Sequence, residues 1–403
     1  MKIALLTILY KNSVSRIYDS RPELAMSPYS KQKQIVDKEA SIWASGWEDA
    51  LIKNNHEVFT IPINVLPMQQ KWAKEQNVKL SSEADIAFQQ IKQFNPDVIW
   101  YDYFDVQLLK KIKSEVKSIK LVLGWTGSVI VDYNILKETD LVLSCAPEAV
   151  EELKKSGIKA AHLNHAFNFS ILEKLDLDKI AKGIDFIFIG QIFRGANLHN
   201  KREKLLSDLI TNTDLKIYSP IFDFNHKTIL KSIIKRAGYY LTAPLGNTTL
   251  SKDLLLKNEF FKEFRRSKNS PILPYKFGLK RKVFPPVYGA QMYSVIKNAG
   301  VVLNIHSDSS TKYASNMRLF ETTGVGTCLL TDWKENLNNL FKDGSEIISY
   351  KSTEECVEKA GWLLNHREES LQIGKRAQKK TLTQHTYEQR APELLSIIKK
   401  SLK

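Results

Sequence analysis

Short apolar runs separated by helical or polar stretches recur along most of the chain, and this alternation constrains the fold more than any other feature. In the first half the runs are "KIALLTIL", "HEVFTIPI", "PDVIWYDY", "KLVLGW" and "DLVLSC". Strands that alternate with helices form parallel α/β sheets. The sequence therefore predicts an α/β fold, with a long polar loop at Lys11–Gln32 and one helical stretch over residues 35–55.

A chain of 403 residues is too long for one ordinary core, and a second series of strands begins near residue 184. This series comprises "IDFIFIGQI", "LKIYSPI", "VVLNIHS", "CLLTD" and "EIISY". We predict α/β domains at residues 1–170 and 184–384, a charged helical connector at 171–183, and a helix at 385–403 that packs back on the first domain. In such sheets ligands bind beyond the carboxyl ends of the strands, so we expect a cleft between the domains.

The net charge of +15 is the composition feature that points to a partner. It favours something anionic, such as a nucleoside diphosphate, a nucleic acid or an anionic membrane surface. Much of the charge lies in residues 262–282, "KEFRRSKNSPILPYKFGLKRK". This stretch is either a solvated loop or a loop that rests on lipid headgroups. Because no zinc-finger, RNA-recognition or basic-zipper pattern is present, we expect no nucleic-acid partner.

Two further observations indicate the compartment. No apolar stretch reaches the ~18–20 residues that span a bilayer, and the first residues, "MKIALLTILY", lack a signal-peptide cleavage site. The three cysteines, Cys145, Cys328 and Cys356, form neither a metal-binding spacing nor a disulfide framework, which indicates a reducing compartment. We therefore expect a cytoplasmic protein, either free or peripheral on the inner face of the membrane.

The stretch "ASNMRLFETTGVGTCLLTD" has the features of a corner that binds an anion and a ribose. Ser315 or Asn316 is placed to cap a short helix, whose unpaired N–H groups favour an anion. Arg318 and Glu321 are three residues apart and therefore share a helix face. A carboxylate only accepts hydrogen bonds, which suits the vicinal hydroxyls of a ribose. The alternative is a surface ion pair worth under ~1 kcal/mol.

The residues around this helix complete the corner. Gly324 is expected to end the helix and Gly326 to turn the chain into the next strand, since glycine permits a positive φ. The preceding strand, "VVLNIHS", ends with Asn304 and His306. His306 is either part of the site or a loop histidine with satisfied hydrogen bonds.

The pattern N-x-R-x-F-E-x-x-x-x-G, followed by an apolar strand, resembles the C-terminal half of GT-B glycosyltransferases. The similarity is closest to the group 1 branch that contains spore-maturation-type and surface-polysaccharide transferases. It covers residues 287–395 strongly, 185–210 moderately and 1–170 only in architecture. It implies two Rossmann-like domains facing a cleft, with the nucleotide-diphosphate sugar on the C-terminal domain and most of the acceptor on the N-terminal domain.

The resemblance also implies roles for individual residues. Glu321 matches the glutamate that binds the nucleotide ribose, and Gly190 matches the glycine turn that lets the diphosphate approach the backbone. Arg202 matches the arginine after this turn, which would neutralise the leaving nucleoside diphosphate. His306 is a further catalytic candidate, and the other candidates on the donor side are Arg194, Lys201, Asn304, Asn316 and Arg318. For Arg194 and Lys201 the alternative is that they open a surface helix.

One position departs from the family. Many retaining GT-B enzymes carry two glutamates eight positions apart, but the residue eight positions before Glu321 is Tyr313. The stereochemical outcome therefore stays open. An inverting enzyme needs a carboxylate or a histidine to accept the proton of the acceptor. The candidates are Asp102 and Asp105 in "DYFD", and His165.

The resemblance implies no metal or other cofactor, because in GT-B enzymes helix dipoles and basic side chains take the place of a metal cation. The Asp-x-Asp spacing at Asp176–Asp178 is attributed to chance. We predict a glycosyltransferase that moves a sugar from a nucleotide-sugar donor to a glycan or lipid-linked acceptor in surface-polysaccharide synthesis. Two alternatives stay open. One is a sugar-nucleotide epimerase of the same fold, and the other is a non-catalytic basic scaffold that binds a polyanion or a membrane.

Overall fold

The computed structural model describes residues 1–79, 82–128, 134–175, 184–192, 200–223, 230, 233–234, 237–238, 279 and 281–402. The chain divides into two compact units. The first joins Met1–Ile187 with Val287–Lys403, and the second is Phe188–Pro286. Arg194, Asp176–Asp178, the side chain of Lys201 and most of the basic stretch 262–282 lie outside the described residues. The domain boundaries expected from the sequence stay predictions.

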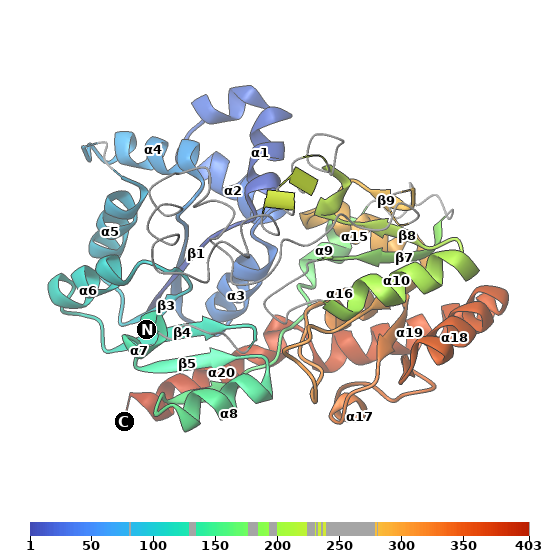
Figure 1. Cartoon of the computed structure of the whole chain (residues 1–403). Helices are drawn as coiled ribbons and strands as arrows, with labels where there is room; N and C mark the ends of the chain where they lie inside the picture. Colours follow the sequence, from blue (N-terminus) through green and yellow to red (C-terminus); the bar gives the residue numbers. More distant parts are fainter. Residues whose placement is uncertain are drawn as a thin grey trace, which may run out of the picture. The chain divides into compact units, whose positions relative to one another are not determined.

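The first sheet has six parallel strands in the order β2-β1-β3-β4-β5-β6 (Figure 1). Their bounds are β1 Lys2–Thr7, β2 Glu57–Pro62, β3 Val98–Tyr101, β4 Leu121–Thr126, β5 Leu141–Ser144 and β6 Ala160–His162. The first five strands are those expected from the apolar runs. β6 was not expected, because its three residues contain no apolar run of strand length.

Helices cover both faces of this sheet because alternate strand residues point to opposite sides. Ile3 and Leu5 of β1 belong to the cluster that contains residues of α3 and α20, whereas Ala4 and Leu6 belong to the cluster on the other face. That other face is covered by α5, α6 and α8. The helices are α3 Ile42–Lys53, α5 Glu83–Phe94, α6 Val106–Glu115, α8 Pro147–Lys155 and α20 Tyr387–Ser401.

Helix α20 packs closely on α3, far from it in sequence. The ring of Tyr387 lies 5.0 Å from that of Trp47, centroid to centroid. A Cβ atom on Gly46 would meet the Tyr387 ring at 2.4 Å, so only glycine permits this approach. The main-chain N–H of Phe167 also donates to the carbonyl of His385 at 2.8 Å, just before α20 begins.

The polar loop expected for Lys11–Gln32 is wrong. The segment forms α1 (Lys11–Asp19), the 3₁₀ helix η1 (Pro22–Met26) and the start of α2 (Tyr29–Glu39). Val14 and Ile17 of α1 are buried in a small cluster with Val36 of α2. The apolar face of each helix is narrow, so α1, η1 and α2 are stabilised by their contacts with one another. The single helical stretch expected over residues 35–55 is also divided, since α2 and α3 are separate helices.

The second sheet has the strand order β12-β11-β10-β7-β8-β9. Its strands are β7 Ile184–Ile189, β8 Lys216–Tyr218, β9 Val283–Phe284, β10 Ala299–Asn304, β11 Cys328–Asp332 and β12 Ile348–Tyr350. The strands β10, β11 and β12 pair in parallel, so their carboxyl ends lie at one edge. The expected α/β fold with two parallel sheets is therefore confirmed.

The remaining helices with assigned bounds complete the description (Figure 1). They are α4 Leu66–Glu75, α7 Asn134–Lys137, α9 Ser170–Lys174, α10 Asn200–Asn212, η3 Pro220–Asp223, α15 Gly289–Lys297, α16 Arg318–Gly324, α17 Leu337–Leu340, α18 Thr353–Asn365 and α19 Arg367–Gln384. Among the helices that the structure describes, none is both long and apolar enough to cross a bilayer.

Candidate active site

Two asparagines join the end of β10 to the start of α16. The side-chain amide of Asn316 donates to Oδ1 of Asn304 at 2.6 Å, and the amide of Asn304 returns a bond to Oδ1 of Asn316 at 3.3 Å. Asn304 also donates to the hydroxyl of Thr331 on β11 at 2.9 Å. The expected cap by Ser315 or Asn316 is wrong, because Met317 occupies the N-cap position in a helical conformation and no side chain caps the helix.

Arg318 and Glu321 form an ion pair at the same corner, with 2.9 Å between Nη1 and Oε2. Their side chains are only 14% and 8% exposed, so this is not the weak surface pair that the sequence left as an alternative. The hydroxyl of Tyr293 on α15 lies 3.4 Å from the other carboxylate oxygen. Burial, followed by the negative charge of Glu321, raises the pKa of Tyr293 well above its usual value. The Glu321 carboxylate is therefore largely shielded from solvent.

The two glycines of the corner have different roles, and the turn with a positive φ expected at Gly326 is confirmed. Gly324 is the last residue of α16, and a Cβ atom there would lie 2.3 Å from the ring of Phe167. Its role is close packing, whereas the chain turns at Gly326, where φ is +79°. The helix body expected at this place is confirmed within one residue at each end.

His306, just beyond β10, contacts Asp332, the last residue of β11. Its Nδ1 lies 2.6 Å from Oδ1 of Asp332, and its main-chain N–H donates to the same oxygen at 3.0 Å. Lys334 reaches the other carboxylate oxygen at 3.2 Å. Burial alone would raise the pKa of Asp332, but the contacts with His306 and Lys334 outweigh it and hold the pKa below its usual range. Asp332 is therefore an ionised carboxylate.

Residues from the first part of the chain also reach this corner. Glu148 of α8 accepts the consecutive main-chain N–H groups of Lys312 and Tyr313, at 2.9 and 2.8 Å. The ring of Tyr10, which follows β1, lies 5.5 Å from that of Tyr288. The Tyr10 side chain is itself 69% exposed. The loop before α16 is thus tied to α8, and the loop after β1 meets Tyr288, which precedes α15.

The structure separates the three base candidates. Asp102 follows β3, and its Oδ2 accepts a hydrogen bond from Thr7 at 2.9 Å. Burial raises the pKa of Asp102 to about 6, with the Thr7 bond opposing this. Asp105 is the N-cap of α6 and accepts the N–H of Leu108 at 2.9 Å. Burial lowers the pKa of His165 to about 3, so its ring is a weak base at neutral pH.

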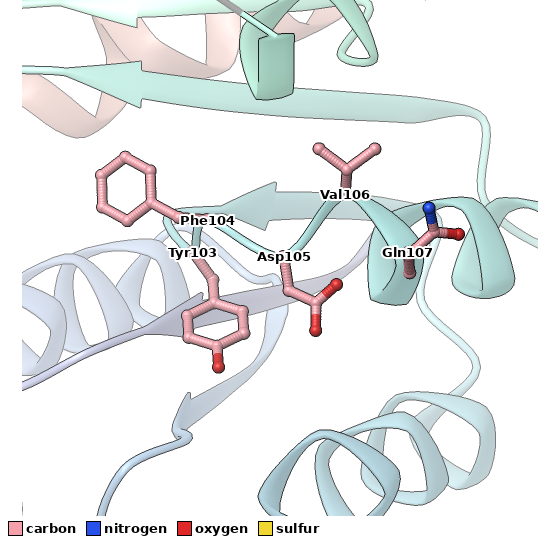
Figure 2. A pocket seen from close by; sticks show the side chains of 5 residues that line it. All are labelled: Tyr103, Phe104, Asp105, Val106 and Gln107. Carbon is pink, nitrogen blue, oxygen red and sulfur yellow. The ribbon is translucent and has the colours of Figure 1, made fainter. Parts of the chain in front are cut away.

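A shallow cavity of about 420 Å³ lies beside Asp105, at the start of α6. It is lined by Tyr103, Phe104, Asp105, Val106 and Gln107, and in Figure 2 the side chains of Tyr103 and Asp105 point to one side of the backbone while those of Phe104 and Val106 point to the other. The Phe104 side chain is exposed. The cavity follows the carboxyl end of β3, where ligands of parallel sheets bind.

In the second unit, Gly190 and Arg202 lie together. A Cβ atom on Gly190 would be 2.9 Å from the ring of Phe188 and 3.6 Å from Nη1 of Arg202. The Arg202 guanidinium is buried, stacks over the Phe188 ring and donates to the carbonyl of Gln191 at 2.9 Å. Gly190 and Arg202 are therefore neighbours in the fold, and their roles toward a diphosphate stay predictions. Arg194 and the side chain of Lys201 lie outside the described residues.

Residues 261–396 match the family described as glycosyl transferase-like, and this stretch contains the whole corner from Asn304 to Asp332. No curated protein sequence matches the chain. A solved glycosyltransferase from Rickettsia africae is 10% identical, with a TM-score of 0.55 over 100% of this chain and 98% of its own. HepE of Anabaena, solved with UDP-glucose, is 8% identical, with a TM-score of 0.54 over 99% and 100%. The chain has the GT-B fold.

A third similar structure is an α-glucosyltransferase solved with UDP and a 13-mer DNA, 13% identical, with a TM-score of 0.55 over 99% of both chains. These low identities show the fold, while the family match shows a glycosyltransferase-like domain. The predicted fold and the predicted enzyme class, a glycosyltransferase, are confirmed. The narrower spore-maturation-type branch stays a prediction.

Three residues of the corner were not singled out from the sequence: Asp332, Lys334 and Glu148. Asp332 faces His306 only because Asn304 and Thr331 are partners in the β10–β11 register. Glu148 lies far from Lys312 in the sequence. The one available signal was the Asp that ends the apolar run "CLLTD".

Proposed function

We propose that the protein transfers a sugar from a nucleotide-diphosphate sugar to an acceptor, with the donor on the β10–α16 corner. The observation that carries this is the protected Arg318–Glu321 pair, at the edge where β10 and β11 end. A carboxylate there can accept both vicinal hydroxyls of a ribose. The proposal is supported by HepE and the α-glucosyltransferase, which have the same fold and were solved with UDP-glucose or UDP.

Around the ribose the corner offers groups for the rest of the donor. Arg318 provides a fixed positive charge near Glu321. His306 lies two residues beyond the end of β10, the strand that precedes this helix. Among the described residues, no group of three or more His, Cys, Asp or Glu side chains is arranged to hold a metal ion. We propose that transfer needs no metal and that basic side chains, Arg202 among them, stabilise the leaving diphosphate.

The acceptor is proposed to be a glycan or lipid-linked saccharide in surface-polysaccharide synthesis, bound beyond the carboxyl end of the first sheet. If the configuration inverts, Asp102 accepts the proton of the acceptor, since a base works best when its pKa is near the working pH. Peripheral binding to an anionic membrane through residues 262–282 belongs to the same proposal. The lack of a nucleic-acid partner stays a prediction, to be checked because the α-glucosyltransferase was solved with DNA.

The first experiment is a thermal-shift screen of the full chain against UDP-, GDP-, dTDP- and CMP-linked sugars, with and without EDTA. A ligand at ~100 times its Kd should stabilise the fold by ~2.7 kcal/mol. One nucleotide that gives a shift unaffected by EDTA supports the proposal and identifies the base. A shift that EDTA abolishes contradicts metal independence. If no nucleotide shifts the transition, the proposal fails, and salt-dependent binding to polyanions tests the scaffold alternative.

Product analysis separates transferase from epimerase. Incubation with the selected nucleotide sugar should release the nucleoside diphosphate when an acceptor is present, whereas an epimerase returns an isomerised nucleotide sugar. Arg202→Ala should lower kcat more than donor affinity, because charge develops on the leaving group in the transition state. Arg202→Lys is the matched control, since it keeps the charge. Equal kcat for both variants and the wild type would remove Arg202 from the mechanism.

A further inference from the structure

His306 is buried, but the residues that the structure describes leave one of its ring nitrogens without a partner. The side chain is 1% exposed, and none of those residues forms a hydrogen bond with Nε2. Leaving a buried polar atom unsatisfied costs ~1–3 kcal/mol, so such atoms in a folded protein need an explanation. In contrast, both ring nitrogens of the buried His385 are bonded, to the carbonyl of Leu340 and to Arg390. Nε2 of His306 is therefore a buried nitrogen whose hydrogen bond is still to be made.

The contacts of Asp332 fix which ring nitrogen carries the proton. Asp332 is ionised and therefore only accepts hydrogen bonds, so Nδ1 of His306, at 2.6 Å, must be the donor. The main-chain N–H of His306 donates to the same oxygen and fixes the ring relative to the backbone. In the neutral ring, Nε2 is then an acceptor.

Lys334 keeps this arrangement in place. Its ammonium group lies 3.2 Å from Oδ2 of Asp332 and balances the carboxylate charge. It also donates to the carbonyls of Ser310 and Thr311, at 2.7 and 3.1 Å. The loop between β10 and α16 is therefore tied to the end of β11 through one buried cation.

We propose that Nε2 of His306 accepts a hydrogen bond from a hydroxyl of the transferred sugar, and that Asp332 and Lys334 are positioning residues that hold it in the acceptor form. This rests on the proposed function. His306 follows β10 by two residues, at the same strand end as Asn304, which pairs with Asn316 before the Arg318–Glu321 helix. An acceptor nitrogen matches a hydroxyl, whereas a phosphate oxygen offers no proton at neutral pH.

The binding test compares UDP-glucose with UDP, or the corresponding pair with the base that the screen selects. His306→Ala should weaken binding of the sugar nucleotide about 3–10-fold, the value of one hydrogen bond, and change the Kd for the diphosphate less than about twofold. Asp332→Asn should produce part of the same selective loss. His385→Ala is the control and should leave the ratio of the two Kd values unchanged. An equal loss for both ligands in the His306 variant overturns the sugar assignment.

A second measurement needs no variant to fold. In wild-type protein labelled with ¹⁵N in the histidine rings, NMR should show His306 as the neutral ring protonated at Nδ1 near pH 7.5. Its Nε2 signal should move with UDP-glucose but not with UDP, while the signals of His385 stay in place. An imidazolium, or a ring protonated at Nε2, overturns the proposal. If UDP-glucose stabilises the protein but the Nε2 signal of His306 does not move, this inference fails while the proposed function stands. If no nucleotide sugar binds, the proposed function itself fails.

Discussion

Replacing Glu321 tests stability and binding at one position. From the sequence alone, a cleft carboxylate should be removable at little cost, but the structure places it 8% exposed against a guanidinium that is itself only 14% exposed. Removing one partner of a buried ion pair costs ~3–5 kcal/mol. Because this pair keeps some exposure, we expect Glu321→Ala to lower the free energy of unfolding by ~3 kcal/mol. Glu335→Ala, in a half-exposed pair with Lys312, should lower it by less than ~1 kcal/mol.

Glu321→Gln separates the two effects. The amide keeps the size and one acceptor oxygen but loses the charge, so the stability loss should be only ~1–2 kcal/mol. Hydrogen bonds to a charged group are worth ~1.5–3 kcal/mol, so the Kd for the nucleotide should rise about 10–100-fold. Urea unfolding gives the stabilities, and calorimetry with the nucleotide selected by the screen gives the Kd. Wild-type affinity in Glu321→Gln would refute the ribose role, and wild-type stability in Glu321→Ala would refute the buried pair.

Three further perturbations test other parts of the structure. Gly289→Ala places a Cβ atom 1.7 Å from a main-chain oxygen at φ +54°, whereas Gly344 has φ +81° and open space around it. In urea unfolding, Gly289→Ala should therefore lower the stability by at least ~1–3 kcal/mol more than Gly344→Ala does. Equal losses for the two variants would contradict the close approach. Because burial raises the pKa of Asp102 to about 6, its ionisation destabilises the folded wild type as the pH rises from 4 to 6. Over that range Asp102→Asn should become more stable relative to the wild type, by up to ~3 kcal/mol. A stability difference that does not change with pH would count against the raised pKa. Glu148→Ala should speed hydrogen exchange at the two main-chain amides that it accepts, and unchanged protection would show that this contact is absent in solution.

Local signals in the sequence predicted elements well wherever the deciding contacts are also local. Pro147 begins α8 as expected, and Gly157 follows it with φ +76°. The capping pattern at Ser352 and Glu355 is confirmed, since the Ser352 hydroxyl accepts the N–H of Glu355 at 3.1 Å. These features depend on residues within one helical turn, so the sequence contains all the necessary information.

The errors arose where distant residues decide the outcome. Val14 and Ile17 look like isolated apolar residues in a polar segment until Val36 covers them. Asn316 looks like a cap, but Asn304 on the preceding strand takes its amide. Asp332 looks like the end of a strand, and only the pairing of β10 with β11 brings it to His306. The motif thus indicated which elements meet at this corner, but the partners within it depended on the strand register.

The packing of α20 on the first sheet has a consequence for biosynthesis. Tyr387, Ala391, Leu394 and Ile398 fill the same cluster as Ile3 and Leu5 of β1. While a ribosome is still translating the C-terminal half of the chain, that face of the first sheet therefore exposes its apolar side chains, including those of Trp47 and Trp100. Chaperones that recognise exposed apolar surface would bind the nascent chain in this interval, and stable folding of the N-terminal half would be delayed until α20 has left the exit tunnel.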